Sequence, residues 1–352
     1  MKETLDTSLT HETRYFSVAL VLLLTIIGPC ARRSSLPPPD GGPTVTTEDQ
    51  HLQPGDYTRR VSVKGMERAY LLHVPQGVER NQSVPVILAF HGGGGTPESF
   101  AQNTDLSAKA GAAGFVVVYP EGFGRSWNAG DCCGPAQRRG IDDVAFVRAV
   151  LDDLATVFKL DQQRIFATGF STGGKFSYRL ACEMSDRIAA IATVSAGISI
   201  PPAECKPSRA MPVLHFHGLA DKYAPFQGGR SVRELAGEQR SVPETIDLWL
   251  NRGGCKGDKK VTYQSGAATC VTYSRCRDGA DVTLCTVQGM GHQWPGGRTV
   301  QGDEMGANTN DISATEMVIK FFRAHPMQPR QQGYLRKALD FIVSIFNKGE
   351  RA

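Results

Sequence analysis

The sequence predicts a doubly wound α/β domain, built on a mainly parallel sheet with helices on both faces. Short apolar runs with the composition of buried strands alternate along the chain with segments whose apolar residues recur at helical spacing. Strands that alternate with helices favour parallel pairing through crossover helices. Several apolar runs also end directly in glycine-containing loops, and loops at strand ends build the functional sites of such folds.

Length and composition favour one large domain. With 352 residues and 41% hydrophobic content, the chain can bury a substantial core, which we expect over residues 57–325. The apolar run 16–29 is too short for a comfortable membrane span and is flanked by arginines, so residues 1–30 are expected to be a signal peptide or a lipoprotein-type anchor. Cys30 lies where a lipoprotein signal places its lipidated cysteine. We therefore expect export, to the cell exterior or the periplasm, either with membrane attachment at Cys30 or without it.

The charge pattern and the cysteines exclude several function classes. The net charge of +4 is spread without long basic runs, so no nucleic-acid partner is expected. Nine cysteines are present, and the set that remains after Cys30 is even, which favours disulfides in an exported protein. No C-x-x-C pair or histidine/cysteine cluster has zinc spacing, so no metal site is expected. We expect no organic cofactor either. We expect Cys255 to pair with Cys276, because both flank the β-like segment before the last strand; the other pairings stay open.

The first elements follow a Pro/Gly-rich tether at residues 31–56. Alternating residues predict a β-hairpin over 61–74 that turns at Lys64-Gly65, and the unbroken apolar run 84–90 predicts a buried strand. A helix is expected around 104–113 and a strand over 115–119. Apolar residues at helical spacing predict a helix over 141–158, with two aspartates near its start that we interpret as structural.

The second half continues the alternation. A strand over 165–167 leads into an amphipathic helix, and buried strands are expected over 188–194 and 212–216. The remaining expected elements are a helix over 242–251, β-like segments at 259–263, 271–273 and 282–287, a closing helix over 311–324, and one amphipathic helix in the C-terminal tail, residues 326–352.

The segment 164–184 contains the central motif. It reads as a strand, a sharp turn with Gly169, Ser171 and Gly173, and a helix, which is the context that a G-x-S-x-G nucleophile elbow requires. A serine hydroxyl is a weak nucleophile, so it must stand clear of the sheet where a base can reach it. The motif also occurs by chance in glycine-rich chains, but here the strand and helix flank it. Ser171 is the predicted nucleophile.

An elbow serine of this kind needs an acid and then a histidine later in the chain. Asp221 follows the buried strand 212–216, and His292 lies in a glycine-flanked loop after the last strand, which gives its ring room to reach Ser171. Asp221 is therefore the predicted acid and His292 the predicted base. His215 and His217 precede this place and share one strand face, which favours hydrogen-bonded core positions.

The run His91-Gly92-Gly93-Gly94-Gly95 follows the buried strand 84–90. Glycines after such a strand leave backbone N–H groups unobstructed, so the N–H of Gly93 or of Gly94 is predicted to form one half of an oxyanion hole. The N–H of Thr172, directly after the nucleophile, is the predicted other donor. The alternative is a loop that is merely flexible. His91 is a candidate for binding substrate or for shaping this loop.

Six ordered blocks resemble secreted polyhydroxybutyrate depolymerases and feruloyl esterases of the α/β-hydrolase fold. They are HGGGG (91–95), SWNAGDCCG (126–134), IDDVAFV (141–147), GFSTGG (169–174), HGLAD (217–221) and GHQWPGG (291–297). The resemblance implies a carboxylic ester hydrolase with Ser171, Asp221 and His292 as its triad. It also implies that Trp294 and Trp127 line the substrate cleft.

Flat aromatic surface in the cleft would favour an aromatic acyl group, such as a feruloyl ester on plant polysaccharide. The expected function is the cleavage of feruloyl or acetyl esters on such polysaccharide through an acyl-enzyme. The alternative within the family is a polyhydroxybutyrate depolymerase acting on 3-hydroxyalkanoate polyester. A peptidase of the same fold is disfavoured, because no added domain restricts entry to peptides. The alternative of a different class is a non-catalytic surface binding protein on a hydrolase scaffold.

Overall fold

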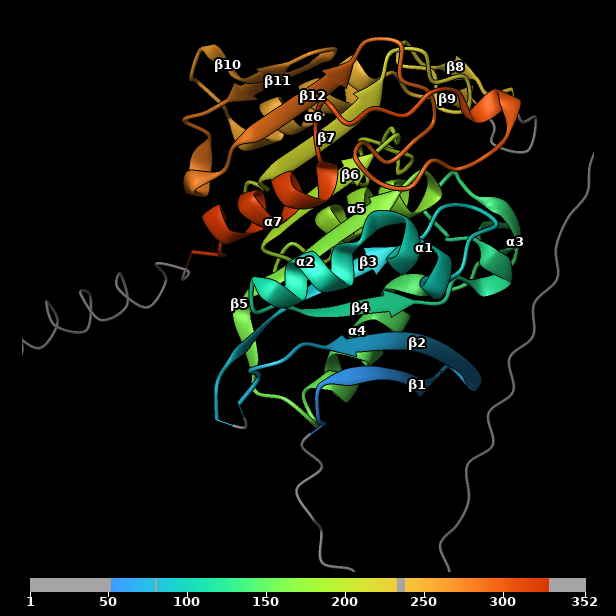
Figure 1. Ribbon diagram of the computed structural model, residues 1–352, viewed down its shortest axis with the longest axis vertical. Coiled ribbons are helices and arrows are strands. Elements are labelled where there is room, and N and C mark those ends of the chain that lie inside the picture. Colours follow the sequence, from blue (N-terminus) through green and yellow to red (C-terminus); the bar gives the residue numbers. More distant parts are fainter. Residues whose placement is uncertain (1–51, 80, 233–237, 329–352) are drawn as a thin grey trace, which may run out of the picture. The chain divides into compact units, whose positions relative to one another are not determined.

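Ten strands form one mixed sheet, in the order β1-β2-β4-β3-β5-β6-β7-β12-β11-β10 (Figure 1). The computed structural model describes residues 52–79, 81–232 and 238–328. The strands of this sheet are β1 (Gly55–Val63), β2 (Met66–Val74), β3 (Val84–Phe90), β4 (Val116–Pro120), β5 (Leu160–Phe170), β6 (Ala190–Val194), β7 (Val213–Gly218), β10 (Lys259–Ser265), β11 (Ala268–Tyr273) and β12 (Val282–Val287). Two short strands, β8 (Gly229–Arg230) and β9 (Glu238–Gln239), form a separate pair.

The centre of the sheet is parallel and its two edges are antiparallel. Strands β4, β3, β5, β6, β7 and β12 all pair in parallel. Both β3 and β4 are buried at every position, as expected for strands covered on both faces. The predicted hairpin is confirmed as β1 and β2, which turn at Lys64 and Gly65 with φ of 50° and 79°. Two positive φ angles are typical of the tight turn that suits the twist of a hairpin.

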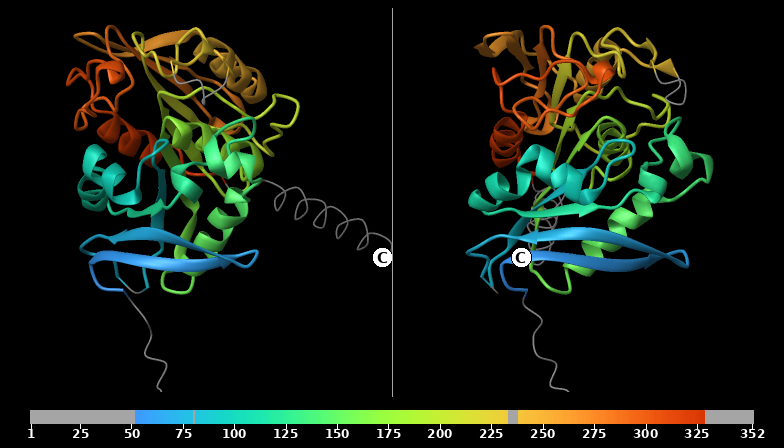
Figure 2. Two further views of the ribbon diagram at one scale, coloured as in Figure 1. Left: turned by 90° about the vertical axis from the view of Figure 1, so that its right-hand side faces the viewer. Right: turned by 45° about the vertical axis from the view of Figure 1, so that its right-hand side comes forward.

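The sheet is covered by helices on both faces. The α-helices are α1 (Pro97–Thr104), α2 (Leu106–Ala112), α3 (Gly134–Arg138), α4 (Asp143–Leu154), α5 (Thr172–Glu183), α6 (Val242–Gly253) and α7 (Ala314–Ala324). One core cluster joins α4, α5 and α6 to one face of the sheet, and a second joins α1, α2 and α7 to the other. Figure 2 shows the hairpin β1–β2 at one edge and β10–β12 at the other. The predicted doubly wound α/β class is confirmed.

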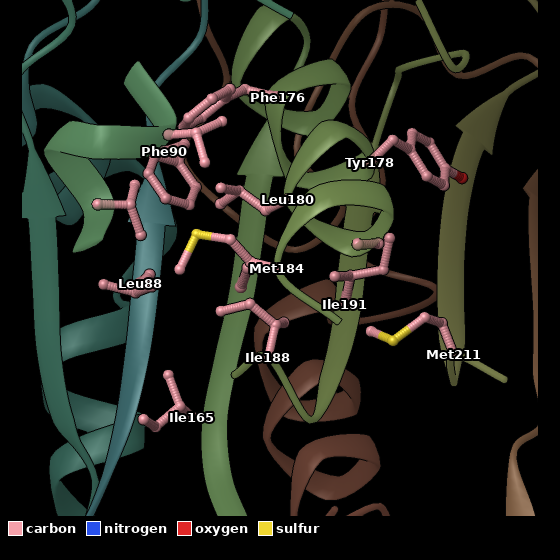
Figure 3. Packing of buried hydrophobic residues seen from close by; sticks show 14 of the residues in the cluster. Leu88, Phe90, Ile165, Phe176, Tyr178, Leu180, Met184, Ile188, Ile191 and Met211 are labelled. Carbon is pink, nitrogen blue, oxygen red and sulfur yellow. The ribbon is translucent and has the colours of Figure 1, made fainter. Parts of the chain in front are cut away.

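Helix α5 is fixed to the sheet by one apolar stripe. Phe176, Leu180 and Met184 recur at i, i+4 spacing and are fully buried. They pack toward Leu88 and Phe90 of β3 (Figure 3). Each such side chain stabilises the fold by about 1.5–3 kcal/mol through burial. The stripe therefore holds the first turn of α5 at the carboxyl end of β5.

One predicted helix is two helices in the structure. The segment expected as a single helix over 104–113 is divided into α1 and α2 at Asp105, whose φ is 53°. α1 starts earlier than predicted, because Thr96 caps it: the Thr96 hydroxyl accepts from the Ser99 N–H while the Ser99 hydroxyl oxygen accepts from the Thr96 N–H.

The aspartates at the start of α4 are structural, as predicted. Asp142 caps the helix by accepting a hydrogen bond from the Ala145 N–H at 2.9 Å. Asp143 is fully buried and pairs with Arg68 at 2.9 Å, so that its charge is compensated.

The cysteines that follow Cys30 are paired in the structure. The pairs are Cys132–Cys133, Cys182–Cys205, Cys255–Cys276 and Cys270–Cys285. The expected Cys255–Cys276 pair is present. The signal or anchor segment with Cys30, the tether up to residue 51, and the tail from residue 329 lie outside the described residues. Within the described ranges, none of the helices has the length and apolarity needed to cross a membrane.

Candidate active site

Ser171 stands on a strained turn between β5 and α5. Its φ of 53° and ψ of −118° are unusual for a residue with a side chain. The backbone is held there because the Ser171 N–H donates to the Val194 carbonyl of β6 at 2.9 Å. A Cβ at Gly173 would collide with the carbonyl oxygens of Phe90 and His91, so only glycine allows α5 to begin this close to β3. The elbow thus presents Ser171 at the carboxyl end of the sheet.

Asp221 and His292 form a hydrogen-bonded pair, although 71 residues separate them in the chain. His292 Nδ1 lies 2.7 Å from Asp221 Oδ2, and both side chains are buried. The loops after β7 and β12 can meet because Gly218 lets the Met290 carbonyl approach, where a Cβ would collide with it.

The carboxylate of Asp221 is held in its charged form. Burial alone would raise its pKa, but the hydrogen bond to His292 and the nearby imidazoles outweigh this, so the net pKa is below its usual range. Its second oxygen, Oδ1, accepts from the N–H groups of Tyr223 at 2.9 Å and Ala224 at 2.8 Å. An ionised acceptor at Nδ1 keeps the proton on that nitrogen, which leaves Nε2 of His292 free to act as a base.

The His292 imidazole is also fixed by its aromatic neighbours. Its ring centroid lies 4.7 Å from that of Phe170 and 5.3 Å from that of Tyr223. Its backbone N–H donates to the Met305 carbonyl at 2.7 Å. Ser171 and His292 line the same cleft, and Asp221 is joined to it by its hydrogen bond to His292.

The predicted oxyanion-hole donors do not behave alike. The Gly94 N–H donates to the Arg125 carbonyl at 2.8 Å and is therefore occupied, which is a correction to its predicted role. Among the described residues, the N–H groups of Gly93 and Thr172 donate no hydrogen bond. The two residues are neighbours, because a Cβ on Gly93 would lie 3.3 Å from Cγ2 of Thr172. Gly93 and Thr172 thus offer two free N–H groups beside Ser171.

His91 shapes the glycine loop and does not line the cleft, so its predicted substrate-binding role is corrected. It is buried, its Nε2 accepts from the Gly122 N–H at 3.0 Å, and its Nδ1 lies 2.8 Å from the Gly92 carbonyl, to which it donates. Burial lowers the pKa of His91, so the neutral ring that this pattern requires is favoured.

Both tryptophans predicted to line the cleft are core residues instead. Trp127 is fully buried, stacks on Phe176 with centroids 5.2 Å apart, and donates from Nε1 to the His91 carbonyl at 2.9 Å. Trp294 is 3% exposed and donates from Nε1 to Thr315 Oγ1 at 2.9 Å. Each indole thus has apolar packing and a partner for its N–H, which is what a buried tryptophan needs. Neither ring lines the cleft.

His215 and His217 lie in the core, as predicted. His217 Nε2 donates to the Ala224 carbonyl at 2.6 Å, and its Nδ1 lies 3.0 Å from His215 Nε2. His215 Nδ1 in turn lies 2.7 Å from the Tyr178 hydroxyl. Burial lowers the pKa of both histidines, so a neutral hydrogen-bonded chain backs the Asp221 loop.

The cleft has a volume of about 590 Å³, which is within the range of small-molecule sites. Sequence reasoning missed most of its walls, because loops far apart in the chain supply them. The lining residues are Gly92, Gly93, Gly94, Gly124, Arg125, Ser126, Cys133, Gly134, Pro135, Phe170, Ser171, Thr172, Lys175, Tyr223, Ala224, Ser231, Gln239, His292, Val300, Gln301, Gly302 and Met305. In the described ranges, no group of three or more histidine, cysteine or acidic side chains is arranged to hold a metal ion.

The fold and this cleft define an α/β-hydrolase of the serine esterase class. The chain belongs to the esterase PHB depolymerase family, whose model matches residues 68–242. It is 31% identical over 336 residues to "Putative esterase NocK" of Nocardia uniformis subsp. tsuyamanensis, a match that covers 88% of this chain and 98% of that one. Family membership makes the chain a carboxylic ester hydrolase.

The chain is also similar to a second esterase and to a solved esterase structure. Feruloyl esterase B of Piromyces equi is 29% identical over 234 residues, which are 64% of this chain but only 42% of that protein. The chain therefore spans less than half the length of this relative. The structure of the acetyl xylan esterase from Aspergillus awamori superposes with a TM-score of 0.53 at 15% identity, covering 76% of this chain and 99% of that one. This likeness supports the fold alone.

Proposed function

We propose that Ser171 is the nucleophile of this esterase, with His292 as its general base and Asp221 as the residue that orients the base. The observation that carries the proposal is the 2.7 Å hydrogen bond between His292 and Asp221 in the cleft that holds Ser171 on its strained turn. Ser171, Asp221 and His292 also follow one another in the chain as nucleophile, acid and base, which is the order that this fold uses.

The reaction proceeds in two similar halves. His292 Nε2 takes the proton of the Ser171 hydroxyl as its oxygen attacks the ester carbonyl, and Asp221 stabilises the imidazolium that forms. The N–H groups of Gly93 and Thr172 bind the carbonyl oxygen as it becomes negative, and each donor stabilises the transition state by about 3 kcal/mol. His292 then protonates the leaving alcohol. Water attacks the acyl-enzyme with the same assistance and releases the acid.

The substrates we propose are feruloyl or acetyl esters of plant polysaccharide. The relative from Piromyces equi is named a feruloyl esterase, which supports this class. A cleft of about 590 Å³ with Phe170, Tyr223 and Met305 in its wall has room for an aromatic acyl group. The burial of both tryptophans removes the stacking argument for aromatic substrates. Polyhydroxybutyrate therefore stays the alternative that the experiment must exclude.

We also propose that the chain is exported and acts outside the cytoplasm. Four disulfides within the described residues support this, because such bonds persist in oxidising compartments. Attachment at Cys30 stays a prediction. Intact-mass measurement of the exported chain should give a mature protein that begins at Cys30 and carries lipid; a start well past Cys30 without lipid would contradict attachment.

The test of the activity compares wild type with Ser171→Ala. The wild type should hydrolyse 4-nitrophenyl acetate, and the variant should lose this activity while keeping the circular dichroism and melting temperature of the wild type. Turnover by the variant at the wild-type rate would refute the nucleophile. Substrate class is tested by kcat/KM for methyl ferulate against a 3-hydroxybutyrate oligomer; preference for the oligomer would favour the depolymerase alternative.

A further inference from the structure

Lys175 lies one helical turn beyond Ser171 and lines the same cleft. Its backbone N–H donates to the Ser171 carbonyl at 3.0 Å, which is the hydrogen bond that joins the N-cap Ser171 to the first turn of α5. α5 begins at Thr172, directly after Ser171, and β5 ends at Phe170, directly before it, so Lys175 lies close to the carboxyl end of β5. The side chain of Lys175 takes part in none of the reaction steps proposed for Ser171, His292 and Asp221.

Among the residues that the structure describes, no carboxylate pairs with the ammonium of Lys175. The residue is 4% exposed, and among the described residues the only acceptor of its Nζ is Sγ of Cys132, at 3.7 Å. Sulfur is a weak acceptor, whereas a buried ammonium is expensive unless a carboxylate or several oxygens compensate it. Burial accordingly lowers the pKa of Lys175 to about 8, which still leaves the side chain mostly charged at neutral pH.

The described part of the walls around Lys175 contains no acid that could pair with it. The described residues of the cleft include a second cation, the exposed Arg125, and no aspartate or glutamate. Asp131 and Glu244 line an adjacent cavity of about 320 Å³, but no salt bridge joins either of them to Lys175. The carboxylate of Glu244 instead accepts hydrogen bonds from the N–H and the hydroxyl of Ser241, at 2.9 and 2.8 Å.

We propose that Lys175 is a substrate-binding residue that pairs with a carboxylate of the ester substrate inside the catalytic cleft. The proposal rests on the esterase function proposed for Ser171. A carboxylate that enters with the substrate would be the missing counter-ion, and a charge-assisted hydrogen bond in a buried site is a strong one. The carboxylate can belong to the acyl group, as in a dicarboxylic hemiester, or to the alcohol, as in a uronic acid unit.

Two pairs of esters distinguish these sources. The acyl pair is 4-nitrophenyl hemiglutarate and 4-nitrophenyl pentanoate; the alcohol pair is 4-acetoxybenzoate and 4-methylphenyl acetate. For each pair, the ratio of kcat/KM of the anionic ester to that of the neutral ester is measured in wild type and in Lys175→Met. Dividing the wild-type ratio by the variant ratio cancels the intrinsic reactivity of the esters. We expect a quotient of about tenfold or more for one pair, since a hydrogen bond to a charged group contributes at least this much.

The matched control is Arg179→Met, which removes the same charge from the next turn of α5. Arg179 pairs with Glu183 and does not line the cleft, so this variant should keep the wild-type ratios. A quotient of about tenfold or more in the acyl pair places the carboxylate in the acyl group. A quotient of this size in the alcohol pair places it in the leaving alcohol. Quotients near one in both pairs, or equal changes in Arg179→Met, would overturn the proposal.

A second measurement needs no variant. In wild type, the anionic preference should decline between pH 7 and 9.5, because Lys175 loses its proton in this range while the substrate carboxylate stays ionised. A constant preference over this range would count against Lys175. If wild type hydrolysed none of the four esters, both the proposed function and this inference would fail. Hydrolysis of the neutral esters together with quotients near one in both pairs would refute the inference alone.

Discussion

Replacing Asp221 by asparagine should inactivate the enzyme without disturbing its fold. Oδ1 of Asp221 accepts two backbone N–H groups, at 2.9 and 2.8 Å, so the asparagine oxygen must take this position. Its NH2 group then faces Nδ1 of His292, where Oδ2 accepts at 2.7 Å in the wild type. Nδ1 must become the acceptor, and the proton moves to Nε2. A ring protonated at Nε2 cannot take the Ser171 proton.

The expected loss in kcat is about 10⁴-fold, the size of effect that tautomer inversion has in a serine–histidine–aspartate triad. At 1.36 kcal/mol for each factor of ten, this is about 5.5 kcal/mol of transition-state stabilisation. The assay is kcat for 4-nitrophenyl acetate at pH 7.5, with melting temperature as the check of folding. Asp142→Asn is the control, because asparagine caps a helix as well as aspartate does and this variant should keep full activity. A folded Asp221→Asn enzyme with more than a tenth of wild-type kcat would refute the reasoning.

Trp294→Ala should lower the free energy of unfolding, measured by urea titration, by about 3–5 kcal/mol, because the indole is buried. Unchanged stability together with a selective loss of methyl ferulate turnover would mean that the ring lies in the cleft. Replacing both Cys182 and Cys205 by serine should lower the free energy of unfolding by about 3 kcal/mol, because their disulfide closes a loop between residues 23 apart. The disulfide of the adjacent Cys132 and Cys133 closes no loop, so replacing this pair should lower the free energy of unfolding much less. Equal losses in the two variants would contradict this. The pKa of Asp221 is lower in the folded protein than the unfolded value of about 3.9, so its charge stabilises the fold above that pH and ceases to do so as pH falls through the folded pKa. The difference in free energy of unfolding between wild type and Asp221→Asn should therefore become smaller below about pH 4. A difference that stays constant with pH would be inconsistent with the depressed pKa.

The sheet and the elbow were predictable because their signals are local. An apolar run such as Val84–Phe90 can only be a buried strand or a buried helix segment, and the glycine run that follows it favours a strand. Glycines on both sides of Ser171 are required by close backbone approaches. Asp221 and His292 could be chosen from their places after strands, because parallel strands bring those ends to one edge of the sheet.

What failed depends on where side chains point and on contacts between distant segments. Trp294 is two residues from His292, but its ring turns the other way, toward Phe100 and Thr315. Gly94 is a plausible oxyanion-hole donor from the sequence, but its N–H donates to the carbonyl of Arg125, which lies on a separate loop. Lys175 was missed because a lysine on an amphipathic helix normally reaches solvent. Its i+4 spacing from Ser171 was the available signal.

Covalent labelling is the most direct test of the central claim, that Ser171 forms the acyl-enzyme in this cleft. Wild type is treated with a fluorophosphonate, a reagent that phosphonylates activated serines, and the adduct is located by peptide mass spectrometry. The account predicts one adduct per chain, on Ser171, formed in step with the loss of esterase activity, and no adduct in Ser171→Ala. Labelling on another serine that tracks inactivation, or full inactivation with Ser171 unmodified, would contradict it.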